Sequence, residues 1–75
     1  MKRKIYKIST ELGRKLKIER IKQNLSQEKL AVMAGISIVA YGSIENGRSS
    51  PKIETLDKLA KALKIELYKL FIFED

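Results

Sequence analysis

Two short helical segments follow each other so closely in this sequence that they restrict how the rest of the chain can fold. Ser26 is typical of the residue that precedes a helix, because its hydroxyl accepts a backbone N–H of the first turn. Gly35 ends that helix, since a residue without a Cβ enters the left-handed conformation at little cost. Ser37 is a second cap only two residues later, and it opens a helix over residues 38–45 that an Asn-Gly pair closes. Two helices joined by so short a turn must cross steeply, which predicts a helix-turn-helix.

The segment before this pair predicts one longer helix, capped by Ser9 or Thr10 and ending near Gln23. Asn24 marks its end, because Asn tolerates the left-handed C-terminal position better than most residues. Residues 1–9 alternate basic and apolar side chains, a pattern that fits either a short extended arm or a helical extension. We describe them as a basic N-terminal arm and residues 10–75 as one domain. Its first helix is expected to turn inward Leu12, Leu16, Ile21 and Leu25, with Arg20 on the same line.

The segment after the pair predicts a strongly amphipathic helix. Ser50 as the cap and Pro51 at the first helical position form a favourable start, and the pattern continues to about Lys64. A short last helix follows, and residues 72–75 form an apolar tail. We therefore predict an all-α protein, a compact bundle of about five short helices around the central pair. The apolar positions of the last two helices are Ile53, Leu56, Leu59, Ala60 and Leu63, then Leu67, Leu70 and Phe71.

The positive charge of the chain is confined to its first third. The net charge is +7, and residues 1–22 hold nine Lys or Arg against two acidic residues, while the remainder is balanced. Such a field favours a polyanionic partner, nucleic acid before membrane, although a solvated basic face explains it equally well.

Several function classes are disfavoured by composition. The chain has no His and no Cys, and it has no Gly-rich phosphate loop, so we expect no enzyme activity, no metal site and no cofactor. No apolar run reaches the roughly 20 residues that cross a bilayer, and no signal peptide is evident. We therefore expect a cytoplasmic protein without a membrane partner, and no small-molecule effector because no effector domain is present.

The combined pattern resembles the Cro/repressor-type (Xre-type) helix-turn-helix family over about residues 12–71. This resemblance implies binding to double-stranded DNA, with the second helix of the central pair in the major groove. The residues that carry it are Leu12-Gly13, Leu16, Arg20, Leu25-Ser26-Gln27-Glu28-Lys29-Leu30-Ala31, Ala34-Gly35-Ile36-Ser37, Ile44-Glu45-Asn46-Gly47, Ser50-Pro51 and residues 56–63.

The resemblance also implies roles for individual residues. Gln27 is expected to bond a DNA phosphate and to brace the recognition helix, and Arg20 and Glu45 are expected to form a buried ion pair. Contacts to phosphate position a protein without reading sequence. Expected at phosphates are Ser26, Gln27, Asn46, Arg48 and Lys52, together with Lys2, Arg3 and Lys4 of the arm; expected at base edges are Ile38, Val39, Ala40 and Ser43.

The positions expected at base edges depart from the family pattern, which often has Gln, Arg, Asn or Ser there. Ile38 and Val39 suit the methyl group of thymine, or they contact protein or nothing at all. Val32 and Met33 add to an unusually apolar surface. Tyr41 takes a core position where the family more often has Ile, which is tolerable if its hydroxyl reaches solvent or a phosphate.

Two functions remain open on the sequence alone. The first is a sequence-specific transcriptional regulator, of the repressor or restriction–modification controller type, acting as a homodimer on a palindromic operator. The second is a protein-interaction module on the same fold, such as an antitoxin or adaptor. A dimer is expected through Tyr68, Ile72 and Phe73, which have no obvious burial site; alternatively, Ile72 and Phe73 fold back over Ile5 and Ile8.

Overall fold

The structure is a computed structural model that describes residues 2–73 and, for side chains, residues 7–73. The chain forms α1 (Lys2–Lys22), α2 (Gln27–Ala34), α3 (Ile38–Glu45), α4 (Ile53–Leu63) and a short 3₁₀ helix, η1 (Leu67–Phe71). The described residues contain no strand, so the predicted all-α class is confirmed. The expected number of about five helices corresponds to four α-helices and the final 3₁₀ helix.

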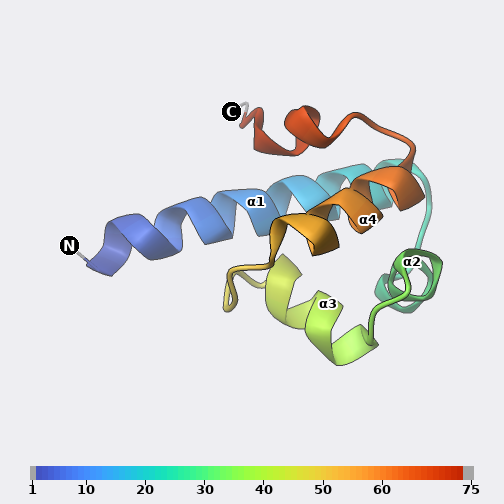
Figure 1. The fold of residues 1–75 in the computed structure, drawn as a ribbon, viewed down its shortest axis with the longest axis horizontal. Coiled ribbons are helices and arrows are strands. Elements are labelled where there is room, and N and C mark those ends of the chain that lie inside the picture. The colour runs from blue at the N-terminus through green and yellow to red at the C-terminus, as the bar shows by residue number, and fades with distance from the viewer. Residues whose placement is uncertain (1, 74–75) are drawn as a thin grey trace.

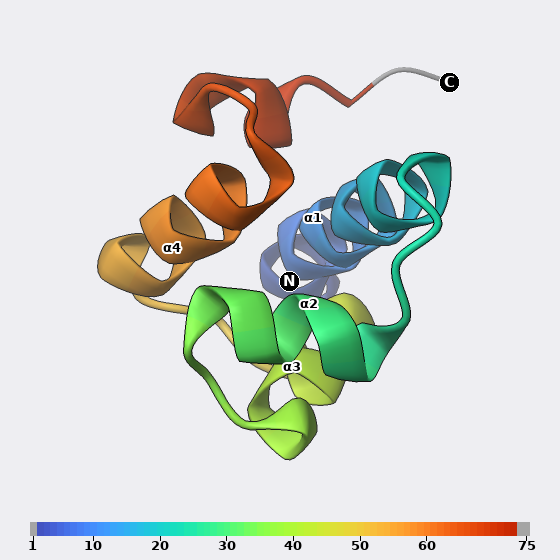
Figure 2. The same cartoon turned by 90° about the vertical axis from the view of Figure 1, so that its right-hand side faces the viewer.

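Helix α1 runs between the two other parts of the molecule. The pair α2 and α3 lies on one side of α1, and η1 lies on the other side, in both views (Figures 1 and 2). Helix α4 packs against α2 and η1, so it joins the two parts. The core between these elements is formed by Leu12, Leu16, Leu30, Ala31, Ala34, Tyr41, Ile44, Leu56, Leu59, Ala60, Leu63 and Leu70.

Helix α1 begins earlier than the sequence predicted. Its backbone is helical from Lys2, so the helical extension is present and neither Ser9 nor Thr10 is an N-cap. Ser9 is buried inside the helix. An N-cap is favoured only at the start of a helix, where backbone N–H groups have no carbonyl partner within the helix. The turns before residue 9 are helical, so residues 9 and 10 are not at such a start. Asn24 has the predicted left-handed conformation after the helix, with φ 58°.

One predicted helix boundary and three predicted burial assignments are wrong. Helix α4 starts at Ile53 with Lys52 as its N-cap, so Ser50 does not cap it and Pro51 is not its first residue. The first α-helical bond of α4 runs from the Leu56 N–H to the Lys52 carbonyl, two residues later than expected. Ile21 is 54% exposed, because its neighbour Arg20 occupies the inward direction about 100° away. Ile53 and Phe71 are also exposed rather than in the core.

Candidate nucleic-acid interface

The turn between α2 and α3 is built by the residues that the sequence singled out. The Ser26 hydroxyl accepts the Lys29 N–H at 2.9 Å, and the Ser37 hydroxyl accepts the Ala40 N–H at 3.0 Å. Gly35 has φ 73°, and its N–H donates to the Val32 carbonyl at 3.1 Å. The backbone groups at the end of α2 and at the start of α3 are therefore hydrogen-bonded, which fixes the direction in which α3 leaves the turn.

The end of α3 is held by a buried carboxylate. The predicted ion pair is present: Arg20 Nε donates to Glu45 Oε1 and Arg20 Nη2 donates to Glu45 Oε2, each at 3.0 Å. The Tyr41 hydroxyl donates to Oε1 at 2.5 Å, and Gln27 Nε2 donates to Oε2 at 2.9 Å. Arg20 Nη1 also donates to the Leu25 carbonyl at 2.7 Å. One carboxylate thus links α1, α2 and α3.

The ionisation of this cluster follows from its hydrogen bonds. Burial alone would raise the pKa of the Glu45 carboxyl, but the hydrogen bonds from Arg20, Tyr41 and Gln27 outweigh burial and hold that pKa below its usual value. Burial and the bond to Glu45 raise the pKa of the Tyr41 hydroxyl above its usual range. Glu45 is therefore an anion and Tyr41 a neutral donor at neutral pH.

Tyr41 and Gly13 have structural roles that the sequence analysis missed. The Tyr41 hydroxyl reaches neither solvent nor a free surface, because it is bonded to Glu45 one turn further along α3. The i,i+4 spacing of Tyr41 and Glu45 was the sequence signal that could have indicated this bond. Gly13 lies against the end of α3, and a Cβ there would stand 2.3 Å from the Glu45 carbonyl oxygen. Only glycine at this position of α1 permits the close approach of the two helices.

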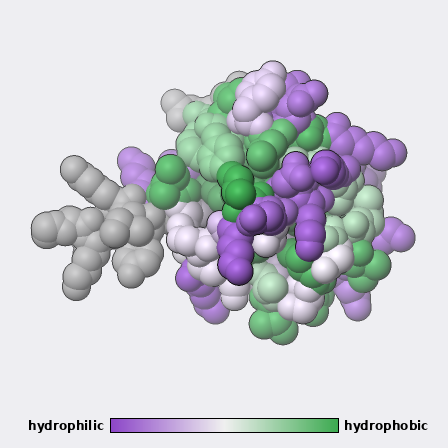
Figure 3. All heavy atoms as spheres, viewed as in Figure 1, coloured by the Kyte–Doolittle hydropathy of each residue, from purple (hydrophilic) through white to green (hydrophobic). Residues whose placement is uncertain are grey.

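The four positions expected at base edges all lie on α3. Ile38, Val39 and Ala40 are exposed, and Ser43 is half-buried. Hydrophobic residues gather at the lower edge of Figure 3, where Figure 1 shows α3. Ala40 and Ser43 border a groove whose remaining lining includes Ser49, Ser50, Pro51, Lys52 and Thr55. The structure therefore presents an apolar helix face beside a polar loop that carries Lys52.

Three of the residues expected at phosphates are attached to α3. Gln27 is joined to it through Glu45, so the predicted bracing of the recognition helix is confirmed. Asn46 is the C-cap of α3, and the Arg48 N–H donates to the Ser43 carbonyl at 2.9 Å. Ser26 is exposed, and its hydroxyl caps α2. The side chains of Lys2, Arg3 and Lys4 lie outside the described residues.

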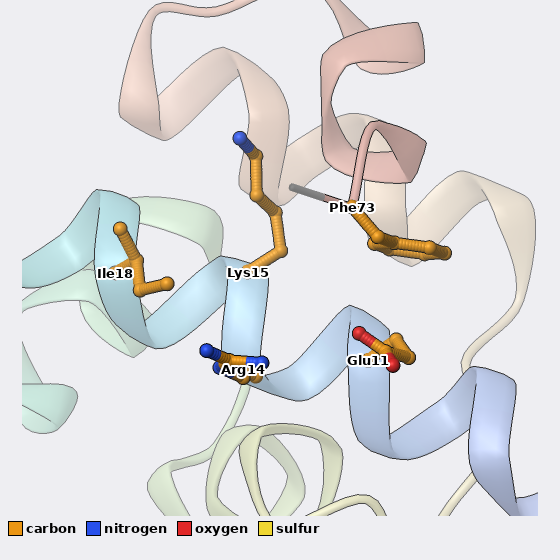
Figure 4. Close-up of a pocket in the computed structure, with 5 residues that line it drawn as sticks. All are labelled: Glu11, Arg14, Lys15, Ile18 and Phe73. Atoms are coloured by element: carbon orange, nitrogen blue, oxygen red, sulfur yellow. The ribbon is translucent and has the colours of Figure 1, made fainter. Parts of the chain in front are cut away.

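Two of the three C-terminal residues expected at a dimer interface, Ile72 and Phe73, lie beside α1. Phe73 points over α1 near Glu11 and borders a pocket with Arg14, Lys15 and Ile18 (Figure 4). It also lies beside Ile8, as the fold-back alternative predicted, but both side chains stay partly exposed. The side chain of Ile5, the other residue of that alternative, lies outside the described residues. Tyr68 and Ile72 are exposed as well, so the tail leaves apolar surface uncovered.

In the described part of the chain, no group of three or more His, Cys, Asp or Glu side chains is placed to hold a metal ion. None of its helices is long and apolar enough to cross a membrane.

Comparison with known proteins assigns the family. A model described as "Helix-turn-helix" matches residues 16–70. An uncharacterised HTH-type transcriptional regulator of Methanocaldococcus jannaschii is 38% identical over 61 residues, which cover 81% of this chain and 92% of that protein. The control protein C.MunI of Mycoplasma sp is 37% identical over 65 residues, covering 85% and 88%. The solved restriction–modification controller protein C.AhdI from Aeromonas hydrophila superposes with a TM-score of 0.85 at 35% identity, covering 88% of this chain and 96% of that one. The chain therefore belongs to the helix-turn-helix family of DNA-binding transcriptional regulators.

Proposed function

We propose that this protein is a cytoplasmic transcriptional regulator that binds a palindromic operator as a homodimer, with α3 in the major groove. The observation that carries the proposal is that hydrogen bonds from α1 and α2 hold α3 in a fixed orientation. Its inner side is fixed by three hydrogen bonds from other helices to the Glu45 carboxylate, two from Arg20 of α1 and one from Gln27 of α2. Its outer side presents exposed side chains. A helix held in this way can enter a groove without losing its orientation.

The polar residues around α3 support backbone contacts. Arg48 and Lys52 are exposed cations in the loop after α3, and Asn46 and Gln27 are attached to the same helix. In this proposal they position the protein on phosphates, and Ser26 contributes at the start of α2. In this proposal the arm residues Lys2, Arg3 and Lys4, which belong to the first turn of α1, make further phosphate contacts.

The homodimer is supported by apolar surface at the C-terminal end. Tyr68, Ile72 and Phe73 remain exposed after the tail has packed on α1. An uncovered apolar cluster on a small protein commonly marks a contact surface, and a two-fold dimer is the commonest closed assembly. Two recognition helices that bind one side of a duplex read half-sites about one DNA turn apart, roughly 34–36 Å.

Selection from random double-stranded DNA tests this function directly. We expect enrichment of an inverted repeat whose half-site spacing matches one turn of the duplex. Recovery of one unrepeated site would refute the palindrome, and no enrichment at any protein concentration would refute sequence-specific binding.

The salt dependence of binding tests the phosphate contacts of the arm. Each neutralised phosphate contributes about −0.9 to the slope of log affinity against log salt. Replacing Lys2, Arg3, Lys4 and Lys7 by Gln removes four charges and keeps good helix formers, so it should flatten the slope. The same replacement at Lys61, Lys64 and Lys69 is the control and should leave the slope unchanged. Equal slopes for the arm variant and the wild type would show that the arm does not contact DNA.

The protein-interaction function has one observation in its favour, the exposed apolar residues near the turn. Val32, Met33, Ile38 and Val39 are all exposed there. A partner protein bound through them would compete with DNA for α3. If the protein binds only such a partner and no DNA, duplex DNA does not reduce binding of the partner. The selection experiment separates the two functions because only a DNA-binding protein enriches a site.

A further inference from the structure

The outer face of α3 has very little hydrogen-bonding capacity. Glu45 is the one charged residue of this helix, and its carboxylate is fully used by Arg20, Tyr41 and Gln27. The Tyr41 hydroxyl is buried in the same cluster. Of the outward positions, only Ser43 carries a polar group, and it is half-buried. The side chains that α3 itself presents are therefore methyl groups, with one hydroxyl.

The apolar groups stand at the start of α3, which is the part of a recognition helix that contacts base edges. Val39 is 76% exposed, and Ile38 is exposed beside it. In the major groove, one feature suits an apolar side chain: the methyl group on C5 of thymine. Cytosine carries no such group, but 5-methylcytosine has a methyl on the same ring atom, projecting into the same groove.

We propose that α3 reads C5-methyl groups of pyrimidines, so that at the base pair facing Val39 a thymine and a 5-methylcytosine are bound alike. This inference rests on the proposed function. Val39 cannot form a hydrogen bond, so it does not distinguish the amino and keto groups that otherwise separate cytosine from thymine. Cytosine methylation within the operator would then strengthen binding, and the protein would respond to the modification state of its site.

Four duplexes separate the methyl group from the base pair. They carry the selected operator with T·A, uracil·A, C·G or 5-methylcytosine·G at the position facing Val39, which is located by uracil substitution at each thymine in turn. Burial of one methyl group corresponds to about 0.8 kcal/mol, or about fourfold in affinity. We expect the two methylated duplexes to bind about fourfold more tightly, in each half-site, than the two unmethylated ones.

Variants of two exposed valines supply the matched comparison. Val39→Ala should remove the methyl preference, because the side chain no longer reaches the C5 position. Val32 is 70% exposed on α2, and Val32→Ala makes the same chemical change away from the base-edge positions, so the preference should persist. Neither side chain is in the core, so both variants are expected to fold.

The outcomes separate failure of this inference from failure of the proposed DNA-binding function. Site-specific binding with equal affinity for T·A and uracil·A at every thymine would overturn methyl readout and leave the DNA-binding function standing. Weak binding to 5-methylcytosine·G together with tight binding to T·A would overturn the equivalence of the two methylated bases. Failure to select any site would refute the proposed function, and the inference would fail with it.

Discussion

Replacing Glu45 by Gln should remove a large part of the stability of this protein. The substitution keeps the shape of the side chain and removes its charge. One amide oxygen can still accept two of the four hydrogen bonds, but the amide nitrogen then faces two donors. In either orientation of the amide, Arg20 loses one of its bonds to residue 45 and keeps its charge.

The magnitude follows from burial. The Arg20 and Glu45 side chains are 12% and 4% exposed, so this is a buried pair rather than a surface pair. Removing one partner of a buried pair destabilises a protein by about 3–5 kcal/mol. Because Gln retains part of the bonding, we expect the lower end, about 3 kcal/mol. In a domain of this size each kcal/mol lowers Tm by about 4–8 °C, so Tm should fall by about 12–24 °C.

Urea and thermal unfolding followed by circular dichroism at neutral pH measure this loss. The control is Asp57→Asn, which makes the same chemical change in the exposed ion pair between Asp57 and Lys61. Exposed pairs contribute about 0.2–1 kcal/mol, so the control should unfold close to the wild type. If Glu45→Gln is no less stable than Asp57→Asn, the Glu45 carboxylate does not hold the fold together.

Three further predictions concern acid stability, helix contact and assembly. Since the folded pKa of Glu45 is lowered, its contribution is present above the unfolded pKa of about 4.3 and is lost as pH falls through the folded pKa, so stability plotted against pH should fall less steeply in acid for Glu45→Gln than for the wild type. Gly13→Ala should unfold the protein or destabilise it severely, because its Cβ would stand 2.3 Å from a backbone oxygen, whereas Gly42→Ala meets nothing within 4 Å and should stabilise α3 by about 0.5–1 kcal/mol; similar effects of the two would refute the close contact. Phe73→Glu should convert a dimer into a folded monomer in sedimentation, with Val32→Glu as the exposed control on α2, and a monomeric wild type at high concentration would end the dimer hypothesis.

Local chemistry made much of the fold predictable from the sequence. Ser26, Gly35 and Ser37 act within one or two turns of their own position, so their roles as caps could be inferred without tertiary information. The start of α1 could not, because Ser9 suits a cap but the turns before it are also helical. Pro51 likewise suits a first helical position, yet the chain remains non-helical until Ile53.

The contacts that hold the candidate site in place were harder to predict from the sequence. The pairing of Arg20 with Glu45 came from the family resemblance, and the structure confirms it. The bond from Gln27 to Glu45 and the fit of Gly13 against α3 depend on how helices distant in sequence cross, which no local pattern encodes. Burial of Ile21 was wrongly predicted because the pattern counted both Arg20 and Ile21 as inward. Only Arg20 points inward, where it bonds Glu45, and Ile21 is exposed.

The attachment of α3 to α1 has a consequence for the kinetics and heat of binding. A helix that is ordered before it meets its partner avoids the ordering penalty of coupled folding, about 2–5 kcal/mol, and binding should show the heat-capacity change of the contact surface alone. A variant that loosens Arg20 yet remains folded should instead show a larger heat-capacity change and slower association. Loss of a direct contact acts mainly on dissociation, so the two kinds of variant should be separable by their rate constants.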